Sequence, residues 1–188
     1  MNIVDFWLEN DWVIKILVIA LIVVFIIVLE KIYQFYKVSS AMRALKKMKT
    51  LDECKEMDKN VLSDILEDIV SFKNSDISLF NANIGVKLDI FEDKQMRFVG
   101  IISTIAILSP MIGLIGTFIG VWHVFADVGS VGLNDPAMMA KGIKEVLIDT
   151  MAGLVVAVVA MVFFKIFEFL AQRNIMMFEN QLYKLLKT

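Results

Sequence analysis

Three long stretches of the chain carry almost no charge. The first runs from Trp12 to Leu29 with Lys15 as its one charged residue, and the second runs from Phe98 to Ala126 with none. Because about 20 apolar residues span a bilayer as a helix, both stretches predict membrane-spanning helices. The third stretch, Thr150 to Phe164, has only fifteen residues. Its helix must therefore bring a flanking residue such as Asp149 to the membrane edge or inside it.

The charges around these stretches predict the orientation of the chain. Basic residues gather between Lys31 and Lys49 and again after Lys165, whereas the N-terminal flank is acidic. Because basic residues mark the cytoplasmic side, we expect the N-terminus outside and the C-terminus inside. The predicted segments are an outer N-terminus (1–11), a first span (12–30), a cytoplasmic helical segment (31–97), a second span (98–126), an outer loop with the start of the next helix (127–144), a third span (145–167) and a cytoplasmic C-terminal helix (168–188).

The cytoplasmic segment has the pattern of helices joined by turns. Apolar residues at helical spacing between Val61 and Val70 predict one amphipathic helix. A second helix, carrying Ile84, Leu88 and Phe91, is expected to run straight into the second span. Polar clusters predict turns at 74–76 and 81–83.

Composition narrows the class of function. The chain is 58% hydrophobic, with a formal net charge of −2 and no basic stripe, which favours a membrane protein over a nucleic-acid-binding one. One cysteine and one histidine, Cys54 and His123, leave no internal disulfide and no Cys/His metal set. Gly129-Ser130-Val131-Gly132 does not match the Gly-x-Ser-Gly setting of an intramembrane serine protease. We therefore expect no enzyme, no metal and no cofactor.

Small residues recur at three- and four-residue spacing inside the second stretch. Ser109, Gly113 and Thr117 share one helix face, and Gly116 and Gly120 continue the pattern. Small residues let helices approach closely in lipid, where the hydrophobic effect does not draw helices together. Taken alone, this pattern predicts a close helix–helix contact.

Two ordered motifs resemble a known family. The first reads Ser109-Pro110-Met111-Ile112-Gly113-Leu114-Ile115-Gly116-Thr117-Phe118-Ile119-Gly120. The second reads Met139-Ala140-Lys141-Gly142-Ile143-Lys144-Glu145-Val146-Leu147-Ile148-Asp149-Thr150-Met151-Ala152-Gly153-Leu154. Both resemble the ExbB/TolQ/MotA proton-channel family, and ExbB and TolQ more than MotA. The resemblance covers about Ser103 to Phe164.

The resemblance implies an all-α integral membrane protein with three transmembrane helices and long cytoplasmic helical extensions. It implies a ring of copies, pentameric in the family, in the bacterial inner membrane. Within the ring it implies a single-span partner of the ExbD/TolR type, which carries a membrane aspartate. Such a complex converts the proton-motive force into mechanical work on an outer-membrane or envelope process, through a protein of the TonB/TolA type.

The resemblance also assigns roles to individual residues. Thr117 and Thr150 match the two threonines that line the family's inner cavity, although a threonine in a membrane helix often bonds to its own helix's carbonyls. Glu145 falls on the family's glutamate and is expected to serve the ion pathway or subunit pairing. Asp149, four residues on, shares its face and stands where the family has a small apolar residue. The residues expected to pack helices are Ser109, Pro110, Gly113, Gly116, Gly120, Gly153 and Ala157.

Several alternatives stay open at this point. Glu145 and Asp149 could instead lie in the headgroup zone, neutralised by Lys141 and Lys144. If Asp149 is deeper, it faces either the cavity or the neighbouring subunit. Val159 stands where the family commonly has proline, which leaves the cytoplasmic half of the pore uncertain. The alternative functions are a MotA-like flagellar stator subunit and a non-conducting membrane scaffold.

Overall fold

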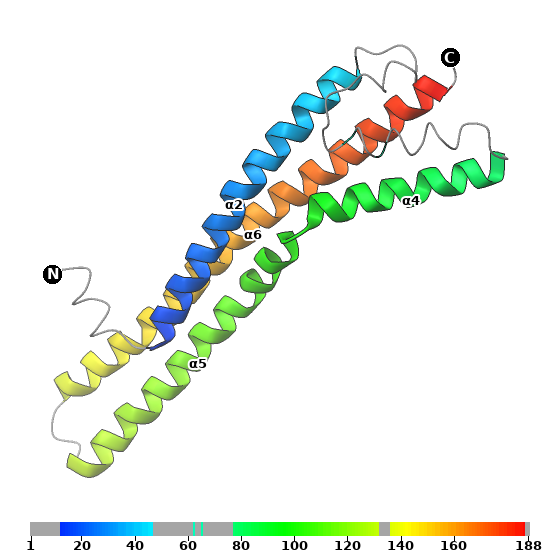
Figure 1. The fold of residues 1–188 in the computed structure, drawn as a ribbon. Helices are drawn as coiled ribbons and strands as arrows, with labels where there is room; N and C mark the ends of the chain where they lie inside the picture. Colours follow the sequence, from blue (N-terminus) through cyan, green and yellow to red (C-terminus); the bar gives the residue numbers. More distant parts are fainter. Residues whose placement is uncertain (1–11, 47–61, 63–64, 66–76, 132–135, 187–188) are drawn as a thin grey trace. The chain divides into compact units, whose positions relative to one another are not determined.

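The computed structural model describes residues 12–46, 62, 65, 77–131 and 136–186 of the chain. Regular structure in these ranges is α-helical: α2 (Trp12–Leu45), α4 (Ile77–Met96), α5 (Val99–Val131) and α6 (Pro136–Leu186) (Figure 1). Three helices are long and apolar enough to cross a membrane, within Trp12–Leu45, Val99–Ala126 and Gly142–Lys184. The predicted all-α fold with three long apolar helices is therefore confirmed for the described residues.

The chain divides into two compact units. The first unit consists of Met1–Val28 and Gly100–Phe164, and the second consists of Leu29–Val99 and Lys165–Thr188. Both α2 and α6 contribute to each unit. Their buried residues recur every three or four positions, which is the spacing that keeps one helix face against its neighbours.

The first unit is held by contacts among α2, α5 and α6. Its apolar cluster is built on Val13 and Leu17 of α2 and Val156 of α6. Side chains of α5, among them Ile105 and Ile112, pack against that cluster. Phe25 and Phe163 meet edge to face, with ring centroids 6.4 Å apart, a geometry that aromatic rings favour.

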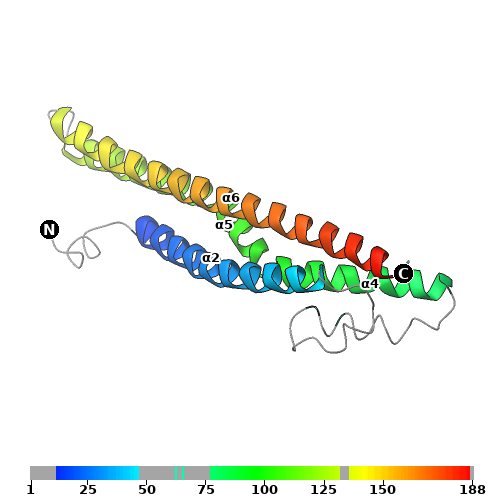
Figure 2. The ribbon, with the colours of Figure 1, turned by 90° about the horizontal axis from the view of Figure 1, so that it is seen from above.

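The second unit has a larger apolar core between α2, α4 and α6. Figure 2 shows these helices turned by 90° from the view of Figure 1. Phe91 of α4 and Phe178 of α6 are both fully buried, with ring centroids 5.1 Å apart. Phe35 of α2 stacks on Phe167 of α6 at 5.7 Å. Leu62 and Ile65 also belong to this core. The rest of the helix predicted at 61–70, and the turn predicted at 74–76, lie outside the described residues.

Side chains from α2 cap the C-terminus of α4. The Lys31 ammonium donates to the backbone carbonyl of Gln95 at 2.8 Å and to Gln34 Oε1 at 2.7 Å. The Gln34 amide donates to the carbonyl of Lys94 at 2.9 Å. The last carbonyls of a helix have no partner within it. A cation at this end also interacts favourably with the helix dipole, which stabilises the helix by about 0.3–1 kcal/mol. We call Lys31 and Gln34 the α4 cap.

The helical structure is interrupted between α4 and α5. The helix stops at Met96, and Phe98 has a φ of 66°, in the left-handed region, before α5 begins at Val99. The Arg97 guanidinium lies 4.9 Å from the centroid of the Phe98 ring. The prediction that this helix runs straight into the second span is therefore wrong. The α4 cap provides the reason, because it satisfies carbonyls that a continuous helix would have used.

Two other helix boundaries differ from the sequence-based predictions. The turn predicted at 81–83 lies inside α4. The C-terminal helix predicted at 168–188 is the last part of α6, which runs for 51 residues without a break. Its first residue is Pro136, which lacks an amide hydrogen that the first turn does not need. The positions of the membrane surfaces along these helices stay predictions.

Candidate functional site in the first unit

Helices α5 and α6 approach closely along a row of small residues. We call Ser109, Gly113, Gly116 and Gly120 of α5, together with Gly153 of α6, the glycine seam. A Cβ placed on Gly153 would lie 2.6 Å from the carbonyl oxygen of Ser109 and 3.2 Å from the Cα of Gly113. Because real Cβ atoms do not come this close to backbone, only glycine fits at this point of the seam.

The other residues predicted to pack helices are Gly120, Pro110 and Ala157, and of these Gly120 faces α6. A Cβ on Gly120 would run into the side chain of Val146 on α6. Pro110 lies inside α5, where it cannot donate to the preceding turn. The neighbouring Ser109 hydroxyl donates to the Ile105 carbonyl at 2.7 Å. Ala157, one turn beyond Gly153, is buried.

Asp149 is buried inside the chain, with 3% of its surface exposed. A Cβ on Gly116 would lie 2.7 Å from Asp149 Oδ2 and 3.0 Å from a methyl group of Val13. The carboxyl group thus packs over Gly116, where α2, α5 and α6 meet. The sequence left open the cavity, the neighbouring subunit and the headgroups for this side chain, and the structure places it in the interior of a single chain.

The hydroxyl groups of Thr117 and Thr150 both donate to carbonyl oxygens of α5. Thr117 Oγ1 donates to the Leu114 carbonyl of its own helix at 2.7 Å, so the back-bonding alternative holds for Thr117 within this chain. Thr150 Oγ1 reaches across from α6 to the Gly113 carbonyl at 3.4 Å. Both side chains are partly exposed in the single chain.

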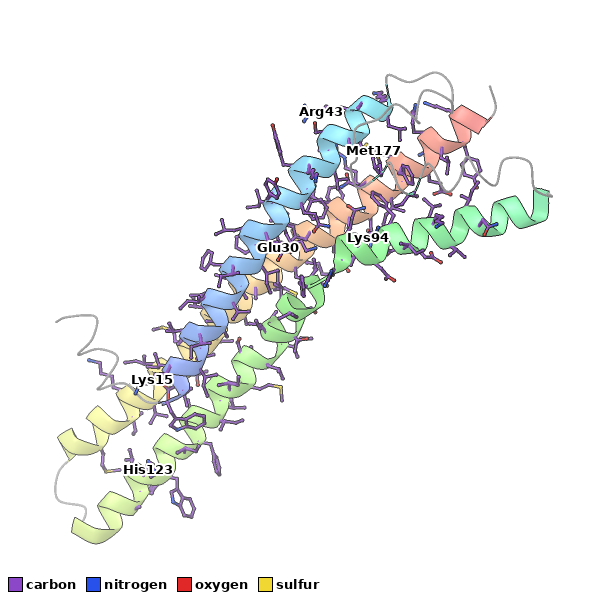
Figure 3. The ribbon with its side chains drawn as sticks, viewed as in Figure 1. Lys15, Glu30, Arg43, Lys94, His123 and Met177 are labelled. Carbon is purple, nitrogen blue, oxygen red and sulfur yellow. The ribbon has the colours of Figure 1, made fainter. Side chains whose placement is uncertain are left out.

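Glu145 lies in α6, one turn before Asp149. Its side chain and that of Lys141 lie outside the described residues, so their roles stay predictions. Lys144 is exposed. His123 near the end of α5 is also exposed and Lys15 of α2 is partly exposed; both are labelled in Figure 3. Among the described residues, no three His, Cys, Asp or Glu side chains gather as metal ligands.

The first unit exposes large apolar side chains on both α5 and α6. The exposed fraction reaches 73% at Phe118 and 68% at Trp122 of α5, and 62% at Met151 and Val158 of α6. Large exposed apolar side chains on helices long and apolar enough to cross a membrane are consistent with a surface that faces lipid or other protein. The site is therefore a packed helix pair with apolar outer faces, two threonine hydroxyls and one interior carboxyl group.

Comparison with known proteins identifies the family. Residues 53–180 match the MotA/TolQ/ExbB proton channel family, and this match covers more than half of the chain. The chain therefore belongs to that family, as its two motifs predicted. The family is one of channel proteins and not of enzymes.

Several relatives are named ExbB. An ExbB homologue of Methanothermobacter thermautotrophicus is 48% identical over 66 residues, which cover 35% of this chain and 23% of that protein. The biopolymer transport protein ExbB of Salmonella typhimurium is 38% identical over 68 residues, covering 36% of this chain and 28% of that protein. ExbB of Neisseria gonorrhoeae is 39% identical over 59 residues, covering 31% of this chain and 27% of its own length. The aligned part thus spans about a quarter of each relative.

Proposed function

We propose that the chain is a ring-forming subunit of a proton channel of the ExbB type. With a single-span ExbD/TolR-type partner, the ring converts the proton-motive force into mechanical work on an envelope process. The observation that carries this proposal is the family match over residues 53–180. The relatives named ExbB support the ExbB type over a MotA-like flagellar stator.

Thr117 and Thr150 are the proposed lining of the proton path. A threonine hydroxyl can donate and accept a hydrogen bond but does not titrate at physiological pH, so it solvates a proton path without storing the proton. In this proposal the titrating carboxyl group is the membrane aspartate of the partner. Glu145 serves at the outer mouth in proton entry or subunit pairing.

The exposed apolar faces of α5 and α6 support assembly with further copies in the bilayer. The proposed ring is a pentamer, by resemblance to the family, with outer N-termini and cytoplasmic C-termini in the inner membrane. A TonB/TolA-type protein is the proposed route to the client. The proposed client is an outer-membrane or envelope process.

Proton flux into vesicles tests the proposal. The ring, reconstituted with and without its partner, is given an inside-negative potential, and the internal pH is followed with a dye. We expect flux with the partner and its loss in the double variant Thr117→Val/Thr150→Val, with the ring still assembled. Thr104→Val is the matched control, because Thr104 is an exposed α5 threonine whose hydroxyl bonds its own helix at Gly100 O, 3.0 Å away.

Two results would contradict the proposal. Full flux in the double valine variant would remove the two threonines from the path. If the assembled complex gave no more flux than empty vesicles, the result would favour a non-conducting scaffold. The close packing at the glycine seam is compatible with that alternative too.

A further inference from the structure

The break between α4 and α5 occurs where the local sequence does not call for one. Residues 94–99 contain no proline and no glycine, and the residue with positive φ is Phe98. Helices usually end on a left-handed glycine or asparagine, because a side chain with a Cβ is disfavoured in that conformation. Something outside the local sequence must therefore keep the helix from continuing.

The α4 cap occupies the carbonyl groups that a continuous helix would need. In an α-helix, the carbonyls of Lys94 and Gln95 would accept from the amides of Phe98 and Val99, four residues on. In the structure these same carbonyls accept from Gln34 Nε2 and Lys31 Nζ. Capping by α2 and continuation of the helix therefore compete for the same acceptors.

The broken junction carries visible costs of its own. Besides the positive φ of Phe98, Lys31 is buried with 1% of its surface exposed. The Gln95 side chain accepts from Asn174 Nδ2 at 2.9 Å, yet its own buried Nε2 finds no acceptor among the described residues. Buried donors without acceptors are rare in native structures and mark sites under strain. The contacts of the α4 cap must therefore offset these costs.

We propose that Lys31 and Gln34 are positioning residues of a two-state junction. In one state they cap α4 and the chain turns at Phe98. In the other state the cap is released and one helix runs on from α4 through Phe98 into α5. This goes beyond the proposed function, because the switch belongs to the chain whether or not the ring conducts protons. If the ring does conduct, the switch gives the cytoplasmic helices a way to control the start of α5.

The φ angle of Phe98 reports the state of the junction. The sequence contains a single Arg-Phe pair, Arg97-Phe98. Labelling arginine carbonyl carbon and phenylalanine nitrogen therefore selects this one peptide in the full-length protein. With the phenylalanine α-carbon labelled as well, a solid-state NMR dipolar measurement of the H–N–Cα–H torsion in lipid vesicles gives the size and sign of φ at Phe98. The partner is not needed, so the result is independent of proton flux.

We compare the wild type with the uncapped variant Lys31→Met/Gln34→Leu. The wild type should show the positive φ, and the uncapped variant should move to the helical value near about −63°. Lys94→Met is the matched control: its exposed side chain (Figure 3) takes no part in the cap, and φ should stay positive. Adding Phe98→Gly to the uncapped variant should restore the positive φ, because glycine adopts it without steric cost.

A positive φ that persists in the uncapped variant would overturn the proposal. An uncapped variant in which Phe98 shows a broad range of φ values, without the helical value, would overturn it as well. If the double variant does not fold, Gln34→Leu alone still tests the idea. Its bond to Lys94 O lies at the exposed edge of the cap, and its loss should give a mixture of both φ values. A single positive population there would equally reject the two-state junction.

Discussion

Replacing Gly153 by alanine tests whether α5 and α6 need their close approach. The added methyl group would lie 2.6 Å from the Ser109 carbonyl oxygen, about 0.8 Å inside an ordinary van der Waals contact. Both atoms belong to the main chain or are fixed to it, so neither can swing aside. The two helices must separate, and dispersion contacts weaken along the whole glycine seam.

The expected loss in the free energy of unfolding is the difference between two opposing contributions. Forcing a methylene-sized group into a packed contact costs about 1–3 kcal/mol, and here it acts between two backbones. Alanine regains up to about 1 kcal/mol as the better helix former. Because the separation also loosens the contacts at Gly113 and Gly116, we expect Gly153→Ala to lower the free energy of unfolding by about 2 kcal/mol.

Titration with sodium dodecyl sulphate, followed by circular dichroism, measures this change in the purified protein. Gly85→Ala is the matched control, since nothing lies within 4 Å of a Cβ placed on this α4 residue, and it should stabilise by about 0.5–1 kcal/mol. Gly116→Ala should fall between them, because the atoms that its methyl group would meet belong to the side chains of Asp149 and Val13 and not to the backbone. If Gly153→Ala were as stable as the wild type, or shifted in the same direction as Gly85→Ala, the seam would not be the close contact described.

Two further predictions concern the carboxyl groups and the topology. Glu145→Ala should abolish proton flux while Asp149→Ala keeps most of it, because the Asp149 carboxyl is packed inside the chain over Gly116; the reverse order would show that the key carboxyl group lies one turn further along α6. A membrane-impermeant maleimide added outside should label a cysteine placed at Gly132 but not the native Cys54. Labelling of both from one side would disprove the predicted orientation.

The membrane helices and the family could be read from the sequence, because both depend on local features. An uncharged run of sufficient length predicts a span wherever it occurs, and the two motifs identify the family without any knowledge of packing. The role of Thr117 and Thr150 stays a prediction. The length of α6 was missed for a different reason. Charged residues follow Phe164, yet Phe167, Ala171 and Phe178 keep the three- and four-residue spacing of buried positions. That spacing was the available sign that the helix continues.

The junction and the interior carboxyl group could not be predicted in the same way. Lys31 counted as one of the cytoplasmic charges, but it is buried and bonded to a carbonyl 64 residues away. No local pattern shows such a partner. Asp149 is different, because it shares the spacing of the buried Val146 and Gly153 on α6. Its position on the helix face could therefore have predicted its burial, whereas its depth in the membrane stays a prediction.

The glycine seam limits which parts of the first unit can move. At Gly153 and Gly113 the main chains of α5 and α6 are in direct contact, so one helix cannot rotate or slide along the other without collision. The two helices therefore act as a single stiff plate that holds Thr117 and Thr150 at a fixed separation. Under the proposed function, any turning during transport would take place at the outer faces of this plate, which expose apolar side chains of α5 and α6.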